Sequence, residues 1–342
     1  MAVWMVRAGK QGIWEDIALE KNIAGTGWVR LPDIGSVKTR KEMFKLIKEH
    51  YPEYSTAKTS NATGQLFAMS QRIQKGDLVI MPLRNKSGFA IGEITGDYKF
   101  RTDLGPNVRH TRAVKWIKEE VPRTAFQQDL LYSLGAIMTV CQIKRNNAEE
   151  RIRAFLKSGK DPGFTDLADN GESVSEDDES ATQTDIEQLA RDQIMRKIAE
   201  SFQGHDFAKL VEEVLIAQGY ITEFSPPGPD GGVDILAGKG PMGFEAPKLC
   251  VQVKATQSSV DVNVFRALQG TMINFKAEQG LLVSWGGFTK NVEREARQSF
   301  FNVRLWDADD FVEAIFKNYD KLSDNIKAEL PLKRLWALVV EE

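Results

Sequence analysis

Two strand-like stretches in the last third of the chain carry polar residues where an apolar core is expected. Asp234 lies within GVDIL, and 18 positions later Gln252 and Lys254 alternate with valines in CVQVK. Successive side chains of a strand point to opposite faces, so Gln252 and Lys254 share one face while the valines enter the apolar layer. Burying a carboxylate without a partner is costly, which favours a functional reason for Asp234. The pattern predicts neighbouring strands with one chemically distinct edge.

An acidic residue on one strand and a polar-x-Lys pair on the next suit metal-dependent phosphodiester hydrolysis. The phosphodiester is anionic and resists attack, so a divalent metal must be held against the phosphate and a cation placed beside the attacking water. Asp234 supplies a hard oxygen ligand, and Lys254 is placed to orient or deprotonate the water. Oxygen ligands and a phosphate substrate favour Mg²⁺. The alternative for Lys254 is an edge-strand lysine that discourages aggregation.

The segments around these residues resemble the Mrr-like branch of the PD-(D/E)xK nuclease superfamily. A helix-like stretch, FAKLVEEVLIAQGY at 207–220, precedes GPDGGVDIL at 228–236, CVQVK at 250–254 and LLVSWGGFT at 281–289. The resemblance covers about residues 200–310. It implies an α/β domain with a central mixed sheet flanked by helices.

The resemblance also implies a set of metal ligands. That branch accepts Gln where other members have a carboxylate, so Gln252 joins Asp234 as a catalytic residue and ligand. The family often carries a ligating Glu directly after the helix-initial Phe, but that position is Ala208 here. Glu212 lies one turn later on the same flank and is the candidate substitute, both as ligand and as catalytic residue. Its alternative role is a solvated helix flank.

The formal net charge of −3 conceals a strong asymmetry along the 342 residues. Residues 1–157 hold 26 Lys/Arg and 16 Asp/Glu, a net of +10, which suits a polyanionic partner. Residues 158–183 hold one Lys and eight acidic residues among Gly and Ser, which predicts a disordered acidic linker. Residues 184–342 have a net charge of −6. We therefore predict a reader domain over 1–157 that folds independently, the linker, and an endonuclease domain over 184–342.

The N-terminal part consists of short β-rich runs separated by glycines and turns. Helices are expected near 39–49 and 124–134, and the whole predicts an α+β domain built on a small β-barrel. The succession KGDLVIMPL, FAIGEITGDYKF and HTRAVKW resembles the PUA-like group that includes EVE and YTH domains. The resemblance implies a reader that takes a base, often a modified one, out of its stack into an aromatic pocket.

Reading an extruded base requires aromatic faces and a few polar groups for the base edge. Trp14 and Trp28 lie in loop-like segments, and Asn61 and Gln65 lie in TSNATGQLFAM. These four residues are the base-reading candidates. Core packing is the alternative for each Trp, and a turn or capping role is the alternative for the two amides.

Two further groups of residues complete the predicted reader. Trp4 and Trp116 lie within apolar strands, where a core role is expected. Basic residues near turns are candidates for phosphate contacts, which position a protein on DNA without reading sequence. The candidates are Lys10, Arg30, Arg84 and Lys86.

Other features exclude whole classes of protein. No apolar run approaches the roughly 20 residues needed to span a bilayer. The first residues lack the long apolar segment of a secretory signal. Cys141 and Cys250 lie far apart in apolar contexts without metal-ligand spacing, so both are expected to be buried and reduced. These observations favour a cytoplasmic protein that binds no membrane.

Together the two parts predict a modification-dependent restriction endonuclease that cleaves double-stranded DNA carrying modified bases. Cutting both strands with one active site per chain needs two chains or two successive events, so a homodimer is expected. Two alternatives stay open. The N-terminal domain could sense a small nucleotide signal and license a defence nuclease, or the chain could be a non-catalytic DNA-binding protein with a decayed nuclease fold.

Overall fold

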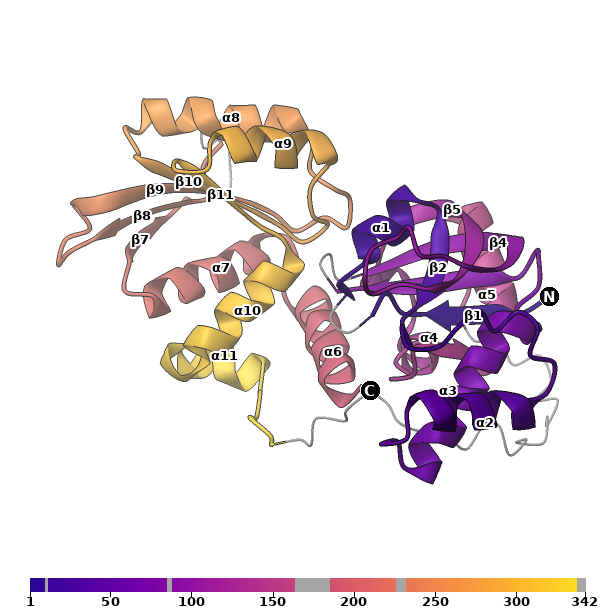
Figure 1. Cartoon of the computed structure of the whole chain (residues 1–342). Coiled ribbons are helices and arrows are strands. Elements are labelled where there is room, and N and C mark those ends of the chain that lie inside the picture. The colour runs from indigo at the N-terminus through magenta and orange to yellow at the C-terminus, as the bar shows by residue number, and fades with distance from the viewer. Residues whose placement is uncertain (10–11, 85–87, 164–184, 226–231, 337–342) are drawn as a thin grey trace. The chain divides into compact units, whose positions relative to one another are not determined.

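A computed structural model describes the chain except at residues 10–11, 85–87, 164–184, 226–231 and 337–342 (Figure 1). Its contacts divide the chain into two compact units, Met1–Gln193 and Ile194–Trp336. The predicted linker lies outside the described residues from 164 onward. Residues 185–193 belong to the first unit, beyond the predicted domain end at 157.

The first unit combines six strands with short helices. Its elements are β1 (Val3–Val6), α1 (Glu15–Glu20), β2 (Ile23–Thr26), α2 (Arg40–His50), α3 (Thr56–Phe67), a π-helical turn (Ala68–Arg72), β3 (Leu78–Leu83), β4 (Gly88–Phe100), β5 (His110–Pro122), a 3₁₀ turn (Arg123–Ala125), α4 (Gln128–Ser133), β6 (Val140–Gln142) and α5 (Ala148–Ser158). The start of α2 follows directly from the sequence, because Thr39 and Glu42 form a reciprocal capping box.

The strands of the first unit form one open sheet in the order β2-β5-β4-β3-β1-β6. Only the β1–β3 pair is parallel among these pairings. Among the described residues the sheet ends at β2 and β6, so the predicted closed barrel is not confirmed. Both end strands are short, four and three residues, while β4 and β5 each run for 13. Short end strands offer few backbone groups for pairing around a closed barrel.

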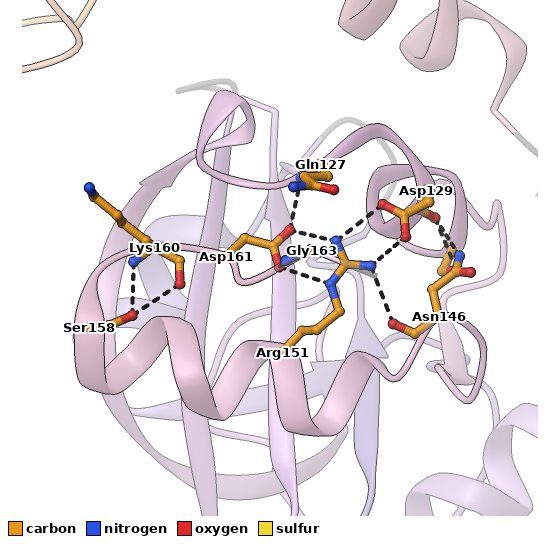
Figure 2. A network of polar contacts seen from close by, with 9 residues as sticks. Gln127, Asp129, Asn146, Arg151, Ser158, Lys160, Asp161 and Gly163 are labelled. Atoms are coloured by element: carbon orange, nitrogen blue, oxygen red, sulfur yellow. Dashed lines mark hydrogen bonds and ion pairs between the residues drawn. The ribbon is translucent and has the colours of Figure 1, made fainter. Parts of the chain in front are cut away.

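Buried ion pairs hold the later part of the first unit to its core. Figure 2 shows Arg151, only 2% exposed, between the carboxylates of Asp129 and Asp161. Arg123 forms a two-pronged pair with Asp192, at 2.5 Å and 2.6 Å, in which both side chains are almost fully buried. Asp161 and Asp192 lie after residue 157, so the structure ties segments on both sides of the predicted boundary into one unit.

Helix α6 (Ile186–Ser201) is followed in the second unit by an alternation of helices and strands. The elements are α7 (His205–Ala217), β7 (Ile221–Phe224), β8 (Ile235–Lys239), β9 (Glu245–Lys254), α8 (Val262–Asn274), β10 (Gln279–Ser284), α9 (Lys290–Gln298), β11 (Val303–Trp306), α10 (Ala308–Asn318), a 3₁₀ turn (Tyr319–Lys321) and α11 (Asp324–Glu329).

The second unit is a three-layer α/β structure. Its sheet has the order β11-β10-β9-β8-β7, with parallel β9, β10 and β11 and antiparallel β7 and β8. Helices α8 and α9 cover one face, and α7 and α10 cover the other (Figure 1). This confirms the predicted central mixed sheet flanked by helices. Both faces are buried because alternate side chains of the central strands enter two separate apolar cores.

Candidate active site

Asp234 lies immediately before β8 and is fastened to the neighbouring strand. Its backbone N–H donates to the carbonyl of Val251 (2.9 Å), and its Oδ2 accepts the N–H of Val253 (2.7 Å). Because Ile235 pairs with Val251 in antiparallel register, Asp234 lies opposite Gln252. The carboxylate is therefore held at the end of β9 that carries Gln252 and Lys254.

The residues of β9 divide between the two faces of the sheet as the alternation predicts. Val251 and Val253 belong to the core beneath α7 and α10, while Cys250 belongs to the core beneath α8. Gln252 follows Cys250 by two residues and so shares the α8 face, where a Cβ on Gly232 would lie 3.4 Å from the hydroxyl of Thr271 on α8 and 3.9 Å from Gln252 Nε2. Lys254 is the half-buried last residue of β9. It is thus on the same face as Gln252, at the carboxyl edge of the strand.

The side chain of Gln252 has a feature expected of a ligand. Only 8% of the residue is exposed, and its Oε1 has no hydrogen-bond partner among the described residues. A buried amide oxygen without a partner costs about 1–3 kcal/mol. A cation coordinated by this oxygen and by the Asp234 carboxylate would remove that penalty. The oxygen donors are of the kind that Mg²⁺ prefers, so the residues fit the ion.

Asp234 is not part of a larger cluster of acidic, His or Cys ligands within the described part of the chain. There, no group of three or more His, Cys, Asp or Glu side chains is close enough to hold a metal ion. Mg²⁺ commonly keeps several waters and uses one or two carboxylates together with substrate phosphate, so a sparse protein ligand set is compatible with it.

Glu212 is engaged elsewhere on the sheet. It lies on α7, and its Oε1 accepts a hydrogen bond from the hydroxyl of Thr222 on β7 (2.8 Å). Thr222 pairs with Ala237 of β8, which lies three residues after Asp234 in the sequence. Ala208, one turn earlier on α7, is buried in the core. The ligand role of Glu212 stays a prediction.

Neither cysteine is available as a nucleophile or metal ligand. Cys141 and Cys250 are free and buried. Burial raises the pKa of Cys141 to about 12 and the pKa of Cys250 to about 11. Both thiols are protonated at neutral pH, as the sequence predicts for buried, reduced residues.

The two tryptophans of the predicted reader have different environments. Trp14 is 6% exposed and packs in an apolar cluster, close enough to Gly9 that a Cβ there would lie 2.4 Å from the indole ring. Trp28 is half-buried and has a left-handed backbone, with φ of 45°. A left-handed conformation is strained for a residue of this size, and strained residues occur more often at functional sites than elsewhere. Trp28 also packs against the apolar cluster around Leu31 and Met43. Trp28 is the stronger candidate for base stacking.

The two side-chain amides predicted to read a base lie on helix α3 and form hydrogen bonds within the protein. Asn61 and Gln65 are one turn apart on α3, and Gln65 Nε2 donates to Asn61 Oδ1 (2.7 Å). Gln65 Oε1 accepts the N–H of Val140 on β6 (2.9 Å). These amides hold the end strand β6 in place, and their contact with a base stays a prediction.

The predicted phosphate contacts are paired with acidic residues where the structure describes them. Arg30 forms an ion pair with Glu53, and its guanidinium lies 3.9 Å from the centroid of the Tyr51 ring. Arg84 forms an ion pair with Asp185. The other two candidates, Lys10 and Lys86, lie outside the described residues.

Comparison with known proteins gives a different family match for each of the two units. Residues 199–315 match a protein family described as "Restriction endonuclease", Mrr_cat. The second unit carries a restriction endonuclease domain. Residues 4–143 match a family described as a domain of unknown function, DUF8426. No curated protein matches the sequence. None of the described helices is long and apolar enough to cross a membrane.

Three solved structures show limited similarity. The DNA modification-dependent restriction endonuclease AspBHI is 16% identical, with a TM-score of 0.33, over 81% of this chain and 74% of that one. The restriction endonuclease MspJI in complex with a 27-mer oligonucleotide is 12% identical, with a TM-score of 0.27, over 96% and 71%. The protein of unknown function AF1548 is 15% identical, with a TM-score of 0.25, over 33% and 65%.

The endonuclease domain contains two buried polar residues near the candidate site that the sequence did not single out, Ser284 beside Lys254 and Thr271 near Gln252. Ser284 of β10 pairs with Lys254 and is fully buried. Thr271 of α8 is also buried, and a Cβ on Gly232 would lie 3.4 Å from its hydroxyl. A polar residue ending the apolar run LLVS was the available signal for Ser284.

Proposed function

We propose that the endonuclease domain hydrolyses DNA phosphodiesters at Asp234, Gln252 and Lys254. The observation that carries this proposal is the pairing of β8 with β9, which sets the Asp234 carboxylate opposite an unpartnered, buried Gln252 oxygen. The match of this domain to a restriction endonuclease family supports the same reaction class.

Each residue has a distinct task in this proposal. Asp234 and Gln252 would hold Mg²⁺ through oxygen atoms. When bound, the ion polarises the phosphate and increases the acidity of water. Lys254 places its ammonium group beside the phosphate, where it orients the attacking water and offsets the negative charge that develops in the transition state.

We further propose that the first unit reads a modified base and thereby directs cleavage. The excess of basic residues in 1–157 supports binding to DNA. The strained, half-buried Trp28 supports a stacking site. An open sheet does not argue against such a reader, because stacking needs an exposed aromatic face and not a closed barrel. Two chains acting together would cut both strands.

The test is to digest otherwise identical DNA duplexes with the full-length protein and Mg²⁺. The duplexes carry no modification, 5-methylcytosine, 5-hydroxymethylcytosine or N6-methyladenine. We expect one modified duplex to be cut about 5-fold to 150-fold faster than the unmodified one, the range that corresponds to the roughly 1–3 kcal/mol contributed by stacking of one base. Equal cutting of all four would refute modified-base reading. Cleavage that requires an added nucleotide would instead favour a nucleotide-sensing first unit.

A second measurement tests the active site. Asp234→Ala and Lys254→Ala should each abolish cleavage and leave DNA binding largely intact, because the basic first unit is unchanged. Glu213→Ala is a matched control, a half-buried carboxylate on α7 next to Glu212. Wild-type cleavage by either active-site variant would show that the site lies elsewhere.

A further inference from the structure

Two loops leave the sheet directly beside Lys254 and are bound to one another. We call them the paired loops: residues 255–260, which follow β9, and residues 285–289, which follow β10. Three hydrogen bonds link these segments, namely Val260 N to Gly287 O (2.9 Å), Thr289 N to Val260 O (3.1 Å) and Ser259 Oγ to Gly286 O (3.1 Å). A further bond, from Trp285 N to Lys254 O (2.9 Å), joins the second loop to β9. The paired loops therefore behave as one rigid surface rather than two independent turns.

Close packing and a buried hydroxyl fix this surface to the active-site strand. A Cβ on Gly286 would lie 2.5 Å from the carbonyl carbon of Gln257 and 2.5 Å from the carbonyl oxygen of Ser258, so only glycine fits. Ser284, the register partner of Lys254, donates its buried hydroxyl to the carbonyl of Gly287 (2.9 Å). The position of the paired loops is thus coupled directly to that of Lys254.

The charge of the paired loops differs from that of the domain around them. Residues 184–342 have a net charge of −6, yet the paired loops, ATQSSV and WGGFT, contain no charged residue. Residues 256–259 are all exposed and include the hydroxyls of Thr256 and Ser258, of which Ser258 donates a hydrogen bond to Thr256 Oγ1 (3.3 Å). A phosphate backbone can approach this surface without meeting a carboxylate on it, and hydroxyl donors can bind phosphate oxygens there.

We propose that the paired loops bind the sugar–phosphate backbone of the DNA strand next to the phosphate at Lys254. Thr256 donates a hydrogen bond to a phosphate oxygen, and Ser258 turns its single hydroxyl hydrogen from Thr256 to a phosphate oxygen when DNA binds. Gly286 sets the spacing of the two loops. This inference rests on the proposed nuclease function of the domain. It adds an uncharged DNA contact beside a site whose positive charges would come from Lys254 and the proposed Mg²⁺.

The first test removes the two hydroxyls together. Thr256→Ala/Ser258→Ala in the full chain should lower kcat/KM for duplex cleavage about 10-fold, the effect of losing two modest hydrogen bonds. The melting temperature should not change, because both side chains are exposed. The slope of log Kd against log salt should also stay unchanged, since no charge is removed. Gln298→Ala, an exposed uncharged residue at the other end of α9, is the control and should cleave normally.

The outcomes separate this inference from the proposed function. A double variant with kcat/KM within about two-fold of wild type, measured beside an inactive Asp234→Asn, overturns the paired-loop contact and leaves the active site standing. An Asp234→Asn variant that cleaves normally overturns both. A change in the salt slope would mean that the loss acts through displaced charges, which also overturns direct contact by the hydroxyls.

The second test concerns loop spacing. Gly286→Ala forces the paired loops apart and should lower kcat/KM at least as much as the double variant. Gly270→Ala on α8 is the matched control, because a Cβ there meets nothing within 4 Å. Normal cleavage and melting of Gly286→Ala would refute the spacing role, while an unfolded variant leaves the exposed double variant as the decisive measurement.

Discussion

Two buried carboxylates of the first unit, Asp161 and Asp192, lie beyond residue 157. The guanidinium of Arg123 is 5% exposed and lies 4.6 Å from the centroid of the Phe89 ring, within the apolar core. Its partner, Asp192, is completely buried. A fragment that ends at residue 157 keeps Arg123 but loses Asp192, and it also separates Arg151 from Asp161.

The expected loss follows from these pairs. Removing one partner of a buried ion pair costs about 3–5 kcal/mol where the rest of the fold stays intact and the remaining charge stays buried. This is the upper limit for a fragment that also lacks α6, the helix that carries Asp192. Arg151 keeps Asp129 but loses two charged hydrogen bonds to Asp161, at 2.8 Å and 2.6 Å. Each such bond contributes about 1.5–3 kcal/mol. The total approaches the stability of a typical domain, about 5–15 kcal/mol.

In place of the independent folding of residues 1–157 predicted from the linker composition, we expect fragment 1–157 to be unfolded and fragment 1–193 to fold cooperatively. Urea unfolding followed by near-ultraviolet circular dichroism measures both. In the full chain, Asp192→Asn should lower the unfolding free energy by about 3 kcal/mol. Asp206→Asn, which breaks the exposed Lys209 pair, is the control and should change it by less than about 0.5 kcal/mol. A cooperative transition for 1–157 at the same midpoint as 1–193 would refute the reasoning.

Three further predictions concern single side chains. Trp28→Ala should remove discrimination between modified and unmodified duplexes without unfolding the protein, whereas Trp14→Ala should lower the unfolding free energy by about 3–5 kcal/mol. Fluorescence titration measures the discrimination and thermal melting measures the stability. A Trp28→Ala variant that still discriminates fully would exclude Trp28 as the stacking residue. Burial lowers the pKa of His110 to about 4, from an ordinary value near 6.5. Protonation of His110 is therefore harder in the folded protein than in the unfolded chain, and the unfolding free energy should fall by up to about 3 kcal/mol as the pH drops from about 6.5 to about 4. His110→Gln should flatten this dependence. An unchanged pH profile in that variant would show that His110 is not the group responsible. Asp234→Asn should keep an acceptor for the N–H of Val253 and so melt near the wild-type temperature. Asp234→Ala leaves that N–H unpaired and should lower the unfolding free energy by about 1–3 kcal/mol. Equal melting temperatures of the two variants would show that this hydrogen bond contributes little.

The endonuclease domain was largely predictable because its signals are local. Alternation along CVQVK predicts which side chains share a face, and GVDIL places a carboxylate at the start of a neighbouring strand. Strand pairing then brings Asp234 opposite Gln252 through backbone geometry alone. The order of helices and strands likewise predicts a covered mixed sheet. Charge along the chain separates a basic first part from an acidic second part without any knowledge of contacts.

Tertiary structure alone decided which residues lie together and which are already occupied. Trp14 reads as a loop residue in sequence, yet folding buries it beneath Gly9. Glu212 lies on the expected helix, but its carboxylate accepts a hydrogen bond from Thr222. Arg123 is paired with Asp192, 69 positions away. The physical reason is that local periodicity specifies the direction of a side chain, whereas its partner depends on packing between segments that are distant in sequence.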